Sequence, residues 1–275
     1  MALLQMQVIG GAPDRNLALA ETLIAEAARG GAALALLPEV MDLGWTDPSA
    51  HTLAAPIPDG EPCQRLMAAA RAHGVYVCAG LTERAGESVY NSAVLLDPQG
   101  KLLLLHRKVN ELAIGHPMYA QGDRLGVAHT DLGPLGLMIC ADGFARDQVL
   151  SRSLGYLGAA VILSPSAWAV PADHDNTVEP YGQIWRDSYG PVARDFALWF
   201  CSVSNVGWIT GGPWSGRRCI GCSLVVDPTG RPVLQGPYGV DAQTILYVEV
   251  APVPRPARGC GWASHWAAQT SGAPR

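Results

Sequence analysis

A strand-like apolar run that ends on a cysteine constrains this chain more than any other feature. The run from Leu135 to Ile139 leads directly into Cys140, Ala141 and Asp142, and helix-compatible sequence begins near Asp147. A side chain that follows a strand and precedes a helix lies at the rim of a sheet, where it can face a pocket. A thiol in such a place can act as a nucleophile, although a lone buried cysteine more often only fills a core.

Two other apolar runs also end on charged side chains. The run from Leu34 to Leu37 leads through Pro38 to Glu39, and the run from Lys101 to Leu105 leads to His106, Arg107 and Lys108. Taken singly, a glutamate after a strand is usually a cap and an Arg-Lys pair is usually exposed. Taken in chain order, the three strand ends offer a carboxylate, an ammonium and a thiol, so that a base, a cation and a thiol are available.

These motifs, in this order, resemble those of the carbon–nitrogen hydrolase (nitrilase) superfamily, whose signature is a Glu-Lys-Cys triad on strand ends. The resemblance runs over most of the chain. Its matching segments are Leu37-Pro38-Glu39, His106-Arg107-Lys108, Ile139-Cys140-Ala141-Asp142 and the stretch from Gly158 to Pro165. It implies an α/β fold, a four-layer α-β-β-α sandwich forming a single domain over residues 1–250. Residues 251–275 would form a tail that packs on the domain or on a partner subunit.

The resemblance also implies the roles of the site residues. Cys140 would attack the substrate carbonyl, Glu39 would act as general base, and Lys108 and the Ala141 backbone N–H would hold the oxyanion. Members of the family often carry a second carboxylate, for which Glu111 is the candidate, although it lies closer to the lysine than is usual. The usual position falls near Gly115 and His116, where no carboxylate stands.

Several large or polar side chains fall where the resembled family contacts its substrate. They are Trp45, Tyr119, His116, Asp142 and Trp168. Each also has an ordinary structural interpretation, as a core aromatic, a loop residue or, for Asp142, a helix cap. The aromatic side chains favour a pocket shaped for an apolar or flat group.

Composition limits the classes of partner that the chain is expected to bind. A net charge of −5 without a basic run argues against nucleic acid, and no apolar run is long enough to cross a membrane. Seven cysteines without a disulfide pattern, and an N-terminus without signal-peptide features, favour the cytoplasm. The resemblance implies a homo-oligomer, because family members pair their sandwiches. We expect neither cofactor nor metal. Cys219 and Cys222 form one CxxC motif, and no second CxxC or HxxxH motif follows to complete a zinc site.

The expected reaction is hydrolysis of a small carboxamide to an acid and ammonia. A nitrilase and an N-carbamoyl-amine hydrolase remain alternatives, and so does a binding protein on the same fold, which would show a broken triad. Nitrile-specific members of the family usually carry Cys-Trp-Glu, whereas this chain has Cys140-Ala141-Asp142. Carbamoyl-specific members usually place an arginine shortly after the cysteine, whereas here three residues separate Asp142 from Arg146.

Periodicity and turn residues predict the elements on which these motifs lie. Asp14 is expected to cap the first helix, Gly190-Pro191 to begin or kink the last, and residues 44–59 to form a loop on the pocket wall. The expected strands cover residues 3–9, 34–37, 75–80, 90–96, 101–105, 126–130, 135–139, 160–163, 199–206, 220–226 and 244–250, and the expected helices cover 14–29, 62–74, 147–157 and 185–197.

Overall fold

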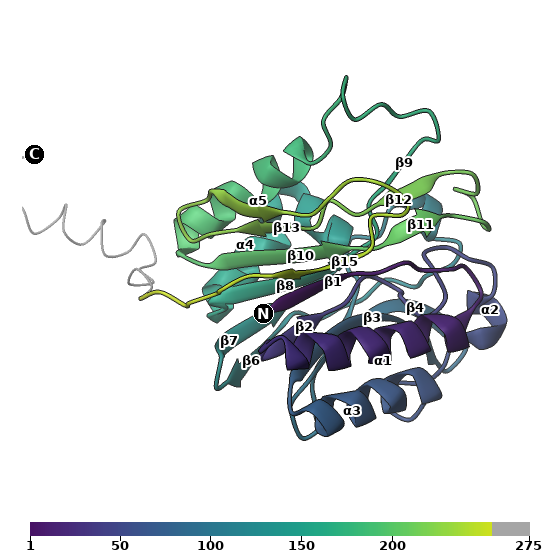
Figure 1. Ribbon diagram of the computed structural model, residues 1–275, viewed down its shortest axis with the longest axis horizontal. Coiled ribbons are helices and arrows are strands. Elements are labelled where there is room, and N and C mark those ends of the chain that lie inside the picture. The colour runs from purple at the N-terminus through teal and green to yellow at the C-terminus, as the bar shows by residue number, and fades with distance from the viewer. Residues whose placement is uncertain (255–275) are drawn as a thin grey trace, which may run out of the picture.

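The computed structural model describes residues 1–254 as two six-stranded sheets packed face to face, with helices on both outer faces (Figure 1). This arrangement confirms the predicted four-layer α-β-β-α sandwich in a single domain. Among the described residues, no helix is long and apolar enough to cross a membrane.

The first sheet has the strand order β15-β1-β2-β3-β4-β5, in which β1, β2 and β3 are parallel and the other pairs antiparallel. Helices α1 (Pro13–Arg29) and α3 (Glu61–His73) cover its outer face. The strands of this sheet are β1 (Ala2–Gln5), β2 (Leu34–Leu36), β3 (Tyr76–Ala85), β4 (Ser88–Leu96), β5 (Leu102–Arg107) and β15 (Thr244–Tyr247).

The second sheet has the order β14-β13-β10-β8-β7-β6, in which β7, β8 and β10 are parallel. Helices α4 (Val149–Leu157) and α5 (Gln183–Phe196) pack on its outer face. Its strands are β6 (Gly126–Thr130), β7 (Gly133–Leu137), β8 (Val161–Ser166), β10 (Trp199–Ser204), β13 (Leu224–Val226) and β14 (Pro232–Gln235).

Short elements complete the rim of the sandwich. A small sheet joins β11 (Val206–Trp208), β12 (Arg218–Ile220) and β9 (Ala169–Val170), and α2 (Ala50–Leu53) is a single helical turn. Within residues 1–254, three 3-10 helices lie in the connections between longer elements, namely η1 (Ala113–Gly115), η2 (Cys140–Phe144) and η3 (Arg146–Gln148).

The apolar core follows the alternation of side chains along each strand. In β2, Leu34 and Leu36 face the second sheet, whereas Ala35 and the next residue, Leu37, face helices α1 and α3. Every residue of β2 is therefore buried on one side or the other, which explains why its sequence reads as a continuous apolar run rather than an alternating one.

Several predicted boundaries are wrong. Helix α1 begins at Pro13 with Ala12 as its N-cap, so Asp14 lies in the first turn and does not cap. The strand predicted over 220–226 is two strands in different sheets, because Gly221 and Cys222 have positive φ angles of 66° and 60° and turn the chain. Helix α5 continues through Pro191, which it contains in its interior.

Some observed strands are shorter than predicted, and one helical turn lies in a segment that was predicted as a loop. The first strand ends at Gln5, the strand predicted over 199–206 ends at Ser204, and the loop over 44–59 contains α2. Of the predicted tail, Ala251 accepts a hydrogen bond from the Trp199 indole at 2.8 Å. Residues 255–275 lie outside the described part of the chain.

Candidate active site

The three strand ends that carry Glu39, Lys108 and Cys140 meet between the two sheets. The Lys108 Nζ lies 2.7 Å from Glu39 Oε1, and both the Glu39 carboxylate and the Lys108 ammonium act on the Cys140 thiol. Exposed fractions of 1% for Glu39, 2% for Lys108 and 8% for Cys140 show that the cluster is nearly closed to solvent. The structure therefore brings together a thiol, a carboxylate and an ammonium, as the sequence predicts.

The backbone on either side of this cluster is held in uncommon conformations. Val40 and Cys140 have φ angles of 37° and 42°, in the left-handed region that side chains with a Cβ rarely adopt. The Cys140 N–H donates to the Ser164 Oγ at 3.2 Å, which anchors the turn to β8. A Cβ at Gly80 would lie 2.5 Å from the Glu39 Cα, so β3 can pass beneath Glu39 only because residue 80 is glycine.

Glu111 completes the buried charge cluster. Its Oε1 accepts hydrogen bonds from Lys108 Nζ and from the Leu112 backbone N–H, both at 2.8 Å. A Cβ at Gly115 would lie 2.8 Å from the Glu111 Cγ, so the absence of a side chain at residue 115 makes room for the Glu111 side chain. The structure thus places a second carboxylate on the lysine from the nearer position along the chain.

Asn91, on β4, is a site residue that the sequence gave no reason to select. Its Nδ2 donates to Glu39 Oε1 at 2.7 Å and to Glu111 Oε2 at 2.9 Å, and its backbone carbonyl accepts from the Lys108 N–H at 2.8 Å. The amide therefore separates two buried carboxylates that would otherwise repel each other. No local motif marks it, because its contacts depend on the antiparallel pairing of β4 with β5.

The charges in the cluster set its resting protonation state. Burial and the Glu39 carboxylate raise the pKa of the Cys140 thiol well above its usual value, although Lys108 and the Ala167 backbone N–H oppose them. Burial alone would lower the pKa of Lys108, but Glu39 and Glu111 outweigh it and raise that pKa. Burial also raises the pKa of Glu39, against the opposing effects of Lys108 and Asn91. The resting cluster therefore holds a neutral thiol beside a carboxylate of increased basicity.

Two indole rings and a phenol lie around the cluster. The Lys108 Nζ lies 5.9 Å from the Trp45 ring centroid, and the Tyr119 hydroxyl accepts from the Thr46 N–H at 3.0 Å. Trp168 stacks on Trp185 with centroids 4.6 Å apart. In the described residues the indole N–H groups of Trp45 and Trp168 are buried without a hydrogen-bond partner, so both are free to bind an acceptor.

The structure places the other two residues predicted to contact substrate, His116 and Asp142, in contacts of their own. His116 is exposed, and its Nε2 lies 3.1 Å from the Glu111 carbonyl oxygen. Asp142 is fully buried and its carboxylate oxygens already accept hydrogen bonds from the His106 ring and three backbone N–H groups, so it has no oxygen left for a substrate.

Cys219 and Cys222, which form the CxxC motif, are buried as cysteines of a protein core usually are. Both side chains are buried and neither forms a disulfide. Burial raises the pKa of Cys219 to about 12 and that of Cys222 to about 11, so both are protonated and unreactive at neutral pH. Within residues 1–254, no group of three or more His, Cys, Asp or Glu side chains is placed to hold a metal ion.

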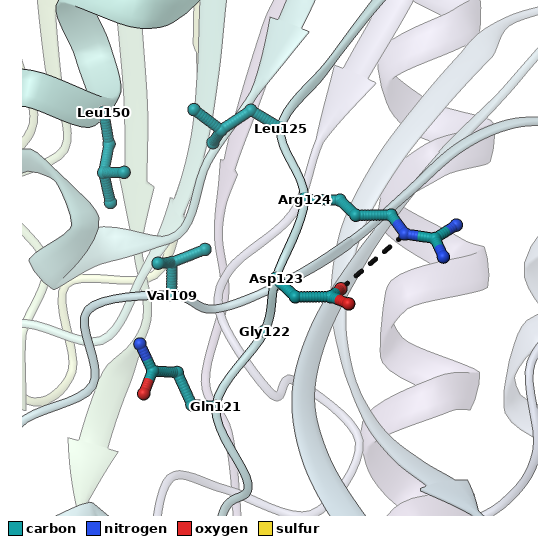
Figure 2. A pocket seen from close by; sticks show the side chains of 7 residues that line it. All are labelled: Val109, Gln121, Gly122, Asp123, Arg124, Leu125 and Leu150. Atoms are coloured by element: carbon teal, nitrogen blue, oxygen red, sulfur yellow. Dashed lines mark ion pairs between the residues drawn. The ribbon is translucent and has the colours of Figure 1, made fainter.

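A groove of about 670 Å³ includes Val109, the residue directly after Lys108, in its lining. Figure 2 shows the side chains that line it. Val109, Leu125 and Leu150 give it apolar walls, whereas Asp123 and Arg124 pair with each other at its edge. None of Glu39, Lys108 and Cys140 lines this groove, so it is separate from the cluster that these three residues form.

Comparison with solved structures gives the fold. The amidase of Nesterenkonia sp. AN1, in a structure with acrylamide added to its active-site cysteine, superposes with a TM-score of 0.76 at 22% identity over 96% of this chain and 98% of that one. A carbon–nitrogen hydrolase of Helicobacter pylori G27 superposes with a TM-score of 0.77 at 23% identity over 89% of this chain and 86% of that one. Both show that the fold is the same.

Sequence comparison gives the family. A nitrilase of Pyrococcus abyssi is 38% identical over 221 residues, 78% of this chain and 76% of that protein. An omega-amidase of Mus musculus is 28% identical over 266 residues, 91% of this chain and 87% of that protein. The family model of the carbon–nitrogen hydrolases matches residues 1–253. The chain therefore belongs to the carbon–nitrogen hydrolase family.

Proposed function

We propose that this hydrolase converts a small carboxamide to its acid and ammonia through a thioester on Cys140. The observation that carries the proposal is the single buried cluster in which Glu39 and Lys108 both act on the Cys140 thiol. An intact triad of this kind speaks against the alternative of a binding protein on the same fold.

The hydrogen bonds of the cluster indicate which atoms would take part in acylation of Cys140. Glu39 Oε1 is occupied by Lys108 and Asn91, which leaves Oε2 to take the thiol proton as sulfur bonds to the amide carbon. The oxyanion that forms needs donors. The Lys108 ammonium has three N–H groups, of which two donate to Glu39 and Glu111 and one is left for the oxyanion. The Ala141 backbone N–H is the second proposed donor.

Collapse of the first intermediate breaks the carbon–nitrogen bond. The nitrogen leaves as ammonia after it takes the proton that Glu39 holds, and the acyl group remains on sulfur. In the second half, Glu39 removes a proton from water, whose oxygen attacks the thioester carbon. The carbon–sulfur bond then breaks, the acid departs, and Glu39 returns the proton to the Cys140 thiolate.

The acyl group is proposed to lie against Trp45, Tyr119 and Trp168. These side chains are 6%, 3% and 2% exposed and form apolar walls beside the cluster. Burial in such surroundings disfavours a charged substituent near the reacting carbon. We therefore propose that the substrate is a neutral aliphatic or aromatic primary amide.

Nitrile hydrolysis is the alternative, since a relative at 38% identity carries the name nitrilase. A matched panel of carboxamides, the corresponding nitriles and the corresponding N-carbamoyl amines separates the possibilities, with ammonia and acid measured for each compound. We expect at least one amide to be hydrolysed faster than its nitrile. Faster turnover of the nitriles would make the enzyme a nitrilase, and turnover of only the carbamoyl compounds would assign it to that class.

We also propose that the chain forms a homo-oligomer. Apolar side chains are exposed on the two helices that cover the second sheet, with exposed fractions of 52% for Val149, 53% for Leu157 and 55% for Ile184. Burying such side chains between copies of the chain would stabilise an assembly. Light scattering should give a mass of at least two chains, and the mass of one chain at every concentration would contradict the proposal.

The cytoplasm is the compartment that we propose. Six cysteines in the described residues are buried thiols, among them Cys63 and Cys78 on the first sheet and its helices. Reduced cysteines of this kind are usual where glutathione and thioredoxin maintain thiols.

A further inference from the structure

The segment that carries Lys108 and the turn that carries Cys140 come from different sheets, yet one carboxylate binds both. The Asp142 Oδ1 accepts from the Val109 N–H at 3.0 Å and from the Asn110 N–H at 2.8 Å. Its Oδ2 accepts from the Ile139 N–H at 2.9 Å. The two residues directly after Lys108 and the residue directly before Cys140 are therefore fixed to the same fully buried side chain.

His106 supplies the fourth hydrogen bond to this carboxylate. Its Nε2 lies 2.7 Å from Asp142 Oδ2, and its Nδ1 lies 3.2 Å from the Arg124 carbonyl oxygen. Burial alone would raise the pKa of Asp142, but His106 and the backbone donors outweigh it and lower that pKa, so the carboxylate is ionised and Nε2 is the donor in this bond.

A second bond ties the same two segments together. The Asn110 Nδ2 donates to the Ala141 carbonyl at 2.6 Å. That carbonyl belongs to the peptide directly after the one whose N–H is the proposed oxyanion donor. The His106 and Asn110 side chains form no hydrogen bond or ion pair with Glu39, Lys108 or Cys140. An effect of either residue on the reaction would therefore have to pass through Asp142 or the nucleophile turn.

We infer that His106, Asp142 and Asn110 are positioning residues that fix the distance between the Lys108 ammonium and the Cys140 thiol. The inference rests on the proposed function of that site. Displacement of reacting groups by about 1 Å can lower a rate about 10²-fold without weakening substrate binding. Loss of these hydrogen bonds should therefore lower kcat and leave KM nearly unchanged.

A matched pair of substitutions at His106 isolates the bond to Asp142. In His106→Gln the side-chain amide nitrogen can occupy the place of Nε2 and still donate to Asp142. In His106→Asn the amide nitrogen corresponds to Nδ1, so it can donate to the Arg124 carbonyl but not to Asp142. Both variants replace the imidazole ring by an amide, so a purely structural role of the ring would lower kcat and Tm alike in the two.

We expect His106→Gln to retain most of the wild-type kcat and His106→Asn to lose about 10- to 100-fold, with KM changed less than about threefold in both. Equal kcat values in the two variants, at any level, would overturn the role of the bond to Asp142. Asn110→Ala should also lower kcat at constant KM. Its control is Thr130→Ala, which removes a comparable 2.8 Å bond to the Gly133 carbonyl in the hairpin between β6 and β7 and should leave kcat unchanged.

The rate at which iodoacetamide alkylates Cys140, followed by intact mass without any substrate, gives a second measurement. Proton removal by Glu39 and stabilisation by Lys108 govern that rate, so it should fall in His106→Asn and Asn110→Ala but not in His106→Gln or Thr130→Ala. If the wild-type protein hydrolyses no amide, the proposed function fails while the alkylation rates still decide the positioning role. Equal alkylation rates in all four variants and the wild type would overturn it.

Discussion

Cys140→Ala is expected to abolish amide turnover and to leave the fold intact. The substitution removes the only atom that bonds to the substrate carbon, and no other nucleophilic side chain of the described cluster can replace it, since Lys108 is held protonated by Glu39 and Glu111. Loss of a catalytic nucleophile lowers kcat by about 10⁴-fold or more. Because the lost side chain is small, the free energy of unfolding should fall by only about 1 kcal/mol.

The matched control for this substitution is Cys63→Ala. Cys63 is also buried, but it lies on α3 and packs in the core between the outer helices and the first sheet, apart from the cluster that contains Cys140. Its variant should lose a similar amount of stability and keep full activity. Undiminished hydrolysis by a correctly folded Cys140→Ala variant would contradict the thioester mechanism, whatever the behaviour of Cys63→Ala.

Glu39→Gln is expected to have the second-largest effect. Glutamine can occupy the same space and still accept from Lys108, but it cannot take the thiol proton or return it to the leaving ammonia. Loss of a general base typically costs about 10² to 10⁴ in rate, and here the same group serves in both half-reactions. We expect kcat to fall by about 10³-fold or more, measured as ammonia release from the best amide of the panel.

Glu111→Gln makes the same chemical change on the other carboxylate that binds Lys108. Since Lys108 Nζ would keep its bond to Glu39 and the thiol would keep its base, the loss should be smaller, about 10- to 100-fold. A larger loss in Glu111→Gln than in Glu39→Gln would exchange the two roles and make Glu111 the base.

The sequence was sufficient for the layers of the fold and for the centre of the site. Glu39, Lys108 and Cys140 each stand directly after a strand-like run or one residue beyond it, and these strand ends from both sheets meet at one rim of the sandwich. The break at Gly221 and Cys222 could not be foreseen in the same way. Both halves of the 220–226 run are apolar and buried, so periodicity alone cannot tell one long strand from two that enter different sheets.

The residues that hold the triad in place were the harder part to predict. Asn91, on β4, contacts Glu39, which follows β2, and Glu111, which follows β5, whereas His106 contacts Asp142 from the opposite sheet. Each of the two residues lies in a run that otherwise has the pattern of an ordinary strand. The two partners of Asn91 are 52 and 20 residues away in the chain, and the partner of His106 is 36 residues away. Such contacts follow from the packing of the two sheets and leave no local pattern.

The central claim is that the acyl group of the substrate passes through the Cys140 sulfur. Intact mass spectrometry of the enzyme quenched during turnover of an amide, followed by peptide mapping, tests it directly. The account predicts an adduct with the mass of the acyl group, without the amide nitrogen, on the peptide that contains Cys140, and no such adduct in Cys140→Ala. Turnover with every cysteine of the quenched enzyme unmodified, under conditions where the second half-reaction limits the rate, would contradict it.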